Sequence, residues 1–209
     1  PLPNAVVLWT RISNVATETQ VTLHVALDGA MKKAVLSERL TTNESRDYTV
    51  KADAQGLMPN TTYFYQFEVN GYRSRVGTTK TAPVTTNHAR FAVVSCSNYP
   101  GGFFNVYHAL TNKNMVGDID AVLHLGDYLY EYAEDEYGDG SRLGRAPLPN
   151  KEITSLSDYR TRHAQYKTDP DLALLHATYP FITVWDDHEI TNDANKSGAE
   201  NHNEGEGDY

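Results

Sequence analysis

The sequence predicts two consecutive parts, an all-β sandwich followed by an α/β domain in which helices pack against a sheet. Two observations predict this order. In the first 80 residues, short runs rich in valine, threonine and aromatic residues alternate with turn residues, which is typical of a sandwich. From residue 91 onward, continuous apolar runs alternate with stretches of helical periodicity, which is typical of strands buried on both faces. The 209 residues suffice for one large domain or two small ones.

The first part is expected to contain strands at 5–12, 21–27, 48–52, 63–69 and 72–78. The run 63–69 alternates apolar or aromatic residues with polar ones, as in a half-buried strand. Asn70-Gly71 follows it and favours a type I′ hairpin turn, because both residues tolerate positive φ. The segment 57–65 resembles the Leu-x-Pro-x-Thr-x-Tyr-x-Tyr signature of fibronectin type III-like domains. We therefore expect a fibronectin type III/Ig-like sandwich over residues 1–80, with a structural role.

A polar, threonine-rich stretch containing Pro83 separates the two parts, so we predict a linker at 81–90 and an α/β domain at 91–209. The formal net charge is −9, and residues 91–209 carry eight basic against twenty acidic side chains. This balance excludes nucleic acid as a structural partner, because no basic surface is available for a phosphate backbone. No apolar run approaches the roughly 18 residues that span a bilayer, so no membrane span is expected. The single cysteine cannot form an intrachain disulfide.

Polar side chains that can bind a metal follow each apolar run of the second part. The runs are 91–95, 121–125 and 181–185, and they are followed by Cys96, by Gly126-Asp127 and by Asp186-Asp187-His188-Glu189. The carboxyl ends of strands in an open α/β sheet form the edge where ligands bind. The repeated pattern therefore predicts one site at this edge.

Simpler interpretations exist for some of these residues. Cys96 alone is typical of a small buried hydrophobe, and Asp127 after glycine is typical of a turn or a helix cap. The four ionisable residues 186–189 resist this explanation, because a cap uses only one of them. His124 is interpreted as a core histidine or a neighbour of the site. We predict solvated surfaces for the acidic stretch 200–208 and for Glu131, Glu134, Asp135 and Glu136.

The spacing Gly126-Asp127-Tyr128-Leu129-Tyr130 matches a Gly-Asp-x-x-Tyr pattern, in which Asp bridges two metals and Tyr binds trivalent iron in purple-acid-phosphatase-like sites. With this motif the sequence resembles the PhoD-type alkaline phosphatases and phosphodiesterases of the metallophosphatase superfamily. The resemblance extends over 6–11, 95–96, 124–131, 158–160, 166–172 and 185–189. It implies hydrolysis of phosphate mono- or diesters by a metal-activated hydroxide, with Fe³⁺ and calcium as cofactors.

The resemblance also implies a role for individual residues. Metal ligands would be Cys96, Asp127, Tyr130 and Asp187, and the catalytic residues would be Asp187 and His188, the latter contacting phosphate or protonating the leaving oxygen. Weaker candidates for a metal or phosphate pocket are Asn192 and Tyr99. The implied partner is a phosphate ester, and the implied location is secreted, periplasmic or cell-surface, although residues 1–209 contain no signal-peptide pattern.

Later metal-binding motifs of the superfamily do not follow Asp193, so we expect an internal fragment that lacks the carboxyl-terminal part of the catalytic domain. Such a fragment would be inactive or nearly so. Two alternatives stay open: a non-enzymatic binding module, and catalysis with Cys96 as a covalent nucleophile. The second is less favoured, because the segment 96–102 contains no arginine to hold a phosphate.

Overall fold

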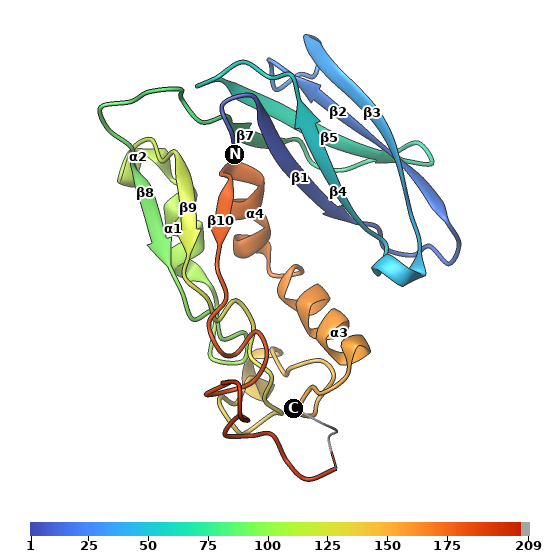
Figure 1. The fold of residues 1–209 in the computed structure, drawn as a ribbon, viewed down its shortest axis with the longest axis vertical. Helices are drawn as coiled ribbons and strands as arrows, with labels where there is room; N and C mark the ends of the chain where they lie inside the picture. Colours follow the sequence, from blue (N-terminus) through green and yellow to red (C-terminus); the bar gives the residue numbers. More distant parts are fainter. Residues whose placement is uncertain (206–209) are drawn as a thin grey trace. The chain divides into compact units, whose positions relative to one another are not determined.

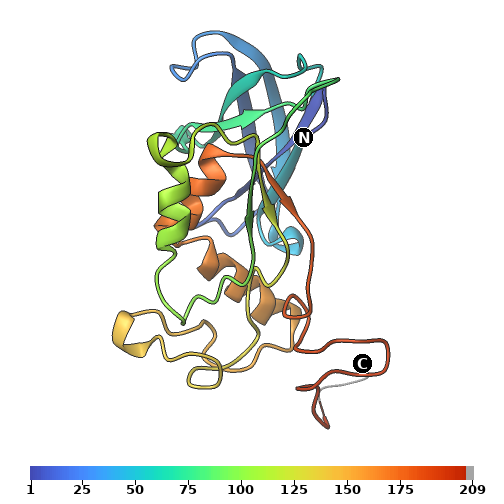
Figure 2. The same ribbon diagram turned by 90° about the vertical axis from the view of Figure 1, so that its left-hand side faces the viewer.

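The computed structural model describes residues 1–205. The chain forms two compact units, the first made of Pro1–Ala89 with His176–Pro180 and the second of Arg90–Leu175 with the chain from Phe181 onward. Figures 1 and 2 show the ribbon from two directions. No helix within residues 1–205 is long and apolar enough to cross a membrane. Residues 206–208 of the predicted acidic stretch lie outside the described residues.

The first unit contains two antiparallel sheets. Strands β1 (Ala5–Arg11) and β4 (Thr49–Gln55) form one of them. The other has the order β3-β2-β5-β6 with β7 also paired to β5, where the bounds are Thr19–Ala26 for β2, Ala34–Thr42 for β3, Thr62–Val69 for β5, Tyr72–Arg73 for β6 and Gly77–Lys80 for β7. A short 3₁₀ helix, η1, covers Glu44–Arg46.

A single apolar core lies between these sheets. Both sheets contribute to it, through Val6, Leu8, Val21, Leu23, Val25, Val50, Ala52, Ala54, Leu57, Tyr63 and Phe67. The hydroxyl of Tyr63 accepts a hydrogen bond from the backbone N–H of Met58 at 2.8 Å, which fixes the segment that enters β5. The two-sheet arrangement agrees with an all-β first part, and its fibronectin type III-like class stays a prediction.

Two details of the predicted strands were wrong. The expected strand 72–78 is divided into β6 and β7, because the Ser74 hydroxyl accepts the Phe67 N–H at 3.0 Å and interrupts the regular ladder. Strand β3 was not predicted. Most of its residues are exposed or half-buried at the sheet edge, so its sequence lacks the apolar alternation of a core strand.

The second unit contains a parallel sheet of order β10-β9-β8, with bounds Phe91–Val94 for β8, Ala121–His124 for β9 and Phe181–Thr183 for β10. Figure 1 shows β9 in the middle. The helices are α1 (Asn105–Thr111), α2 (Lys113–Val116), α3 (Leu156–Tyr166), α4 (Pro170–Thr178) and the 3₁₀ helix η2 (Ser141–Leu143). A capping box of Ser155 and Asp158 starts α3.

The three predicted apolar strands of this unit exist. Burial on both faces holds for the middle strand β9, where the consecutive residues Ala121 and Val122 are both buried, but it was wrong for the edge strands β8 and β10. Side chains on one face are buried, including Ala92, Val122 and His124, whereas Phe91, Val93 and Ile182 are exposed. The physical reason is that helix α1 lies on one side of the sheet, as Figure 2 shows. The strands also end early, so Leu125 and Trp185 belong to the following loops.

Candidate functional site

The loops after β8 and β9 run side by side past the end of the sheet. The Cys96 N–H donates to the Gly126 carbonyl at 3.1 Å, and the Ser97 N–H donates to the Asp127 carbonyl at 2.8 Å. Cys96 and Asp127 have positive φ values of 59° and 53°, so the chain turns sharply at each of them. These two turns bring the cysteine and the aspartate next to one another.

Asp127 is the centre of a first group of side chains. Its Oδ2 atom lies 3.4 Å from Cys96 Sγ and 3.4 Å from the Tyr130 hydroxyl. Its Oδ1 atom is buried and has no hydrogen-bond partner among the described residues. Burial, together with the negative charge of Asp127, raises the pKa of the Tyr130 phenol above its ordinary value.

The loop after β10 adds a second group. One oxygen each from Asp127 and Asp187 and one ring nitrogen of His188 all lie within 4.8 Å of one another. Burial alone would raise the pKa of Asp187, but hydrogen bonds from the backbone N–H groups of Asp193 and His188 outweigh it, and the pKa is lowered. The structure therefore brings together, around Asp127, the predicted residues Cys96, Tyr130, Asp187 and His188.

The side chains of the two weaker candidates make contacts elsewhere, although the backbone N–H of Asn192 donates to Glu131 Oε1 at 2.7 Å. The Asn192 side-chain amide donates to the Glu200 carboxylate. The Tyr99 ring lies under the Arg145 guanidinium, whose central carbon is 3.7 Å from the ring centroid. Arg145 is held in turn by Asp169 at 2.8 Å. These side-chain contacts do not connect Asn192 or Tyr99 to Asp127.

Glu131 corrects a prediction. We predicted a solvated side chain, but Glu131 is completely buried, and its Oε2 atom lies 2.8 Å from Nδ1 of His188. Its acidic neighbours Asp135 and Glu136 are exposed, as predicted. The prediction failed for Glu131 because the partner of a buried carboxylate can be distant in sequence, and His188 is 57 positions away. The one local signal was its place between two tyrosines, Tyr130 and Tyr132.

Two residues hold these loops in a way that sequence reasoning did not predict: Glu189 was counted among the ionisable residues 186–189 without a role of its own, and Arg162 was given none. The Glu189 carboxylate accepts hydrogen bonds from the backbone N–H groups of Asp127 and Tyr128 in the loop after β9, and from that of Asp186 in the loop after β10. Arg162 is buried and donates to backbone carbonyls of the neighbouring loops, those of Tyr130, Tyr132, Leu148, Pro149 and Lys151. Nothing in the local pattern around either residue indicates these contacts.

His124 is the last residue of β9, and its burial confirms the interpretation as a core histidine. It is fully buried, with Nε2 3.0 Å from the Ser97 hydroxyl and Nδ1 accepting the Gly126 N–H at 3.4 Å. Burial, and secondarily the positive charge of Lys167, lowers the pKa of His124 to about 4. A neutral imidazole therefore links the turns that carry Cys96 and Asp127.

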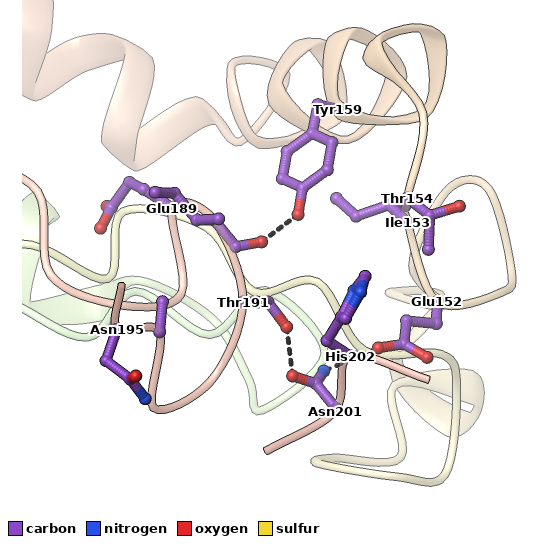
Figure 3. A pocket seen from close by; sticks show the side chains of 11 residues that line it. Glu152, Ile153, Thr154, Tyr159, Glu189, Thr191, Asn195, Asn201 and His202 are labelled. Carbon is purple, nitrogen blue, oxygen red and sulfur yellow. Dashed lines mark hydrogen bonds between the residues drawn. The ribbon is translucent and has the colours of Figure 1, made fainter. Parts of the chain in front are cut away.

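A pocket of about 660 Å³ opens beside the loop that follows His188. Figure 3 shows Tyr159 on one side of it and Thr191, Asn201 and His202 on the other. The Tyr159 hydroxyl donates to the Ile190 carbonyl, and Thr191 contacts Asn201. Glu189 thus takes part both in the wall of this pocket and in the loop contacts at Asp127.

Comparison with known proteins identifies close relatives along the whole chain. Residues 91–209 match the model of the PhoD-like phosphatase family, and residues 1–83 match that of the PhoD-like phosphatase N-terminal domain. Alkaline phosphatase D of Bacillus subtilis (strain 168) is 37% identical over 94% of this chain and 35% of its own length. A solved structure described as "Structure of PhoD" superposes with a TM-score of 0.84 at 36% identity, over 92% of this chain and 38% of that one. The chain thus spans about a third of the length of the relatives it matches, and it belongs to the PhoD-like phosphatase family.

Proposed function

We propose that this chain supplies part of a metal site that hydrolyses phosphate mono- or diesters. The observation that carries the proposal is the group around Asp127, in which the Asp127 carboxylate contacts the Cys96 thiol and the Tyr130 phenol and lies close to Asp187 and His188. Loops after three parallel strands provide these side chains, at the edge where ligands bind in open α/β sheets. Family membership supports the same reaction class.

The donor atoms fit metal ions. A buried carboxylate oxygen without a partner, such as Asp127 Oδ1, is costly unless a cation compensates its charge. Carboxylate oxygens are preferred ligands of calcium, and a phenolate is a hard anionic ligand suited to Fe³⁺. Cys96, Asp127 and Tyr130 would hold the iron, and Asp127 with Asp187 would hold the calcium. Bound cations of this kind neutralise phosphate charge and activate water.

His188 would act on the substrate rather than hold the iron. Its side chain is only 10% exposed, so most of the surrounding water is excluded. A group of this kind can donate a hydrogen bond to a phosphoryl oxygen or a proton to the leaving oxygen. Loss of such a group reduces the rate by roughly 10²–10⁴, and added metal would not restore it.

The test compares the 209-residue chain with a longer form that covers the length of its relatives. Metal content and turnover of an aryl phosphomonoester and an aryl phosphodiester are measured, with iron and calcium supplied. We expect the longer form to bind both metals and hydrolyse ester, and Tyr130→Phe to lose iron, whereas the control Tyr72→Phe, on an 83% exposed tyrosine, has no effect. Hydrolysis that survives complete removal of metal would contradict the proposal.

We further propose that the 209-residue chain alone is inactive or nearly so, as a binding module or partial site. The chain spans about a third of its relatives, so their remaining residues are available to complete the metal coordination. Turnover by the short chain comparable to that of the longer form would refute this point. Export to the periplasm or cell surface stays a prediction from the family resemblance.

A further inference from the structure

We propose that Glu131 is a positioning residue for His188, and that its carboxylate keeps the imidazole proton on Nδ1 so that Nε2 is the nitrogen available to a ligand. The catalytic meaning of this assignment rests on the proposed function. The assignment itself rests on a contact between two buried side chains, Glu131 Oε2 and His188 Nδ1, which are 2.8 Å apart. An ionised carboxylate only accepts hydrogen bonds, so Nδ1 must be the donor.

The pair is held in a rigid frame. Arg162 donates to the backbone carbonyls of Tyr130 and Tyr132, the two residues that flank Glu131, so the backbone that carries the carboxylate is fixed. The ring of His188 packs on Tyr130 with a centroid distance of 4.3 Å and on Tyr132 at 5.6 Å. Neither partner can turn away without breaking these contacts. The tautomer is therefore determined by the chemistry of the Glu131 atom that faces Nδ1.

The hydrogen bonds to Oε1, the other carboxylate oxygen of Glu131, determine the effect of the substitution Glu131→Gln. Oε1 accepts from the Asn192 N–H at 2.7 Å, from Asn201 Nδ2 at 3.0 Å and from the Thr191 hydroxyl at 3.5 Å. In Glu131→Gln the side chain has one oxygen and one NH₂ group. Because three donors face the position of Oε1, the amide oxygen of the glutamine occupies that position. The NH₂ group of the glutamine then faces Nδ1 of His188. Nδ1 must then accept, and the imidazole proton must move to Nε2.

The test is ¹⁵N NMR of the histidine rings in the 209-residue chain at about pH 8.5, above the ordinary histidine pKa of about 6.5. We expect the His188 proton on Nδ1 in the unsubstituted chain and on Nε2 in Glu131→Gln. The matched control is Asp169→Asn, which neutralises another buried carboxylate, paired with Arg145 at 2.8 Å, and should leave the His188 signals unchanged.

A His188 proton on Nε2 in the unsubstituted chain would overturn the proposal, and this measurement decides the matter even if Glu131→Gln fails to fold. An unchanged tautomer in folded Glu131→Gln would also overturn it, because the carboxylate would then not set the proton position. The readout requires no turnover. Absence of phosphoesterase activity would therefore count against the proposed function alone, and the tautomer result would stand by itself.

Discussion

The carboxylate of Glu189 accepts a hydrogen bond from the backbone N–H of Asp127 at 3.0 Å, across 62 positions of sequence. The same carboxylate accepts the N–H groups of Tyr128 and Asp186. Glu189 therefore joins the loop after β9 to the loop after β10, and with them the two candidate metal ligands Asp127 and Asp187. The spacing of these ligands depends on a side chain that is not one of them.

Removal of this carboxylate should destabilise the second unit. Glu189→Ala leaves three backbone N–H groups without their acceptor, and hydrogen bonds to a charged group contribute roughly 1.5–3 kcal/mol each when partly buried. We expect the free energy of unfolding to fall by about 2–4 kcal/mol, less than the sum of three such bonds, because the Asp186 N–H is exposed and can bind water instead. Denaturant titration measures this loss. The control Glu136→Ala removes an exposed acceptor of one N–H, that of Ala133 at 2.9 Å, and should cost less than about 1 kcal/mol. Equal losses would contradict the role of Glu189.

Gly126 should tolerate no side chain. Its φ is +105°, and a Cβ atom there would lie 2.4 Å from the Asp186 nitrogen and 2.9 Å from the Trp185 carbonyl carbon, both backbone atoms. Gly126→Ala should therefore force apart the loops after β9 and β10, at a cost of about 3 kcal/mol or more for overlap and strain together.

A second glycine separates overlap from backbone strain. Gly144 has a φ of +66° and no atom within 4 Å of a Cβ position, so Gly144→Ala should cost only about 1–2 kcal/mol. Denaturant unfolding of both variants gives the comparison. A cost for Gly126→Ala no larger than that for Gly144→Ala would show that the loops do not pack as closely as the structure indicates.

The sequence predicted, for a physical reason, that the candidate site residues lie together. Strands of a parallel sheet are local apolar runs, and their carboxyl ends meet at one edge, so Cys96, Asp127 and Asp187 could be assigned to one place from pattern alone. Their meeting required no knowledge of side-chain contacts. The same local signal failed at β3, where an edge strand is largely exposed and needs no apolar alternation.

The supporting contacts could not be predicted in this way. Glu131 and Arg162 are charged residues, and a charged side chain is usually solvated. Both are buried because partners distant in sequence compensate them: His188 lies 57 positions from Glu131, and the Tyr130 carbonyl lies 32 positions from Arg162. Such partners become visible only when the chain is folded.

Arg162 should not be replaceable by lysine. Its guanidinium donates to backbone carbonyls in two segments, 130–132 and 148–151, and an ammonium group has only three donors in a different geometry. Arg162→Lys should lower the free energy of unfolding by about 2–4 kcal/mol, because buried carbonyls lose their donors. The matched change Arg142→Lys, on an exposed arginine, should be neutral within about 0.5 kcal/mol. If denaturant titration shows no loss of stability in Arg162→Lys, the hydrogen bonds of Arg162 do not hold these two segments together.

His124 should make the stability of the fold depend on acid pH. Its pKa is lowered by burial to about 4 in the folded chain, whereas an unfolded histidine has a pKa of about 6.5. Between these two values the unfolded chain binds more protons than the folded one, so the contribution of a neutral His124 is fully present above about pH 6.5 and is lost as the pH falls toward 4. From pH 7 to pH 5 the loss should be about 2 kcal/mol.

His124→Gln removes this titration. The variant should be less stable at pH 7, because the contacts of the ring with Ser97 and Gly126 are altered, but its free energy of unfolding should fall less between pH 7 and pH 5 by about the same 2 kcal/mol. The exposed His88 provides the control, since His88→Gln should keep the full pH dependence of the unsubstituted chain. Denaturant titrations of the three proteins at both pH values give the answer. If His124→Gln and His88→Gln lose stability equally on acidification, the acid sensitivity arises elsewhere, and His124 is not the buried neutral link between the turns of Cys96 and Asp127.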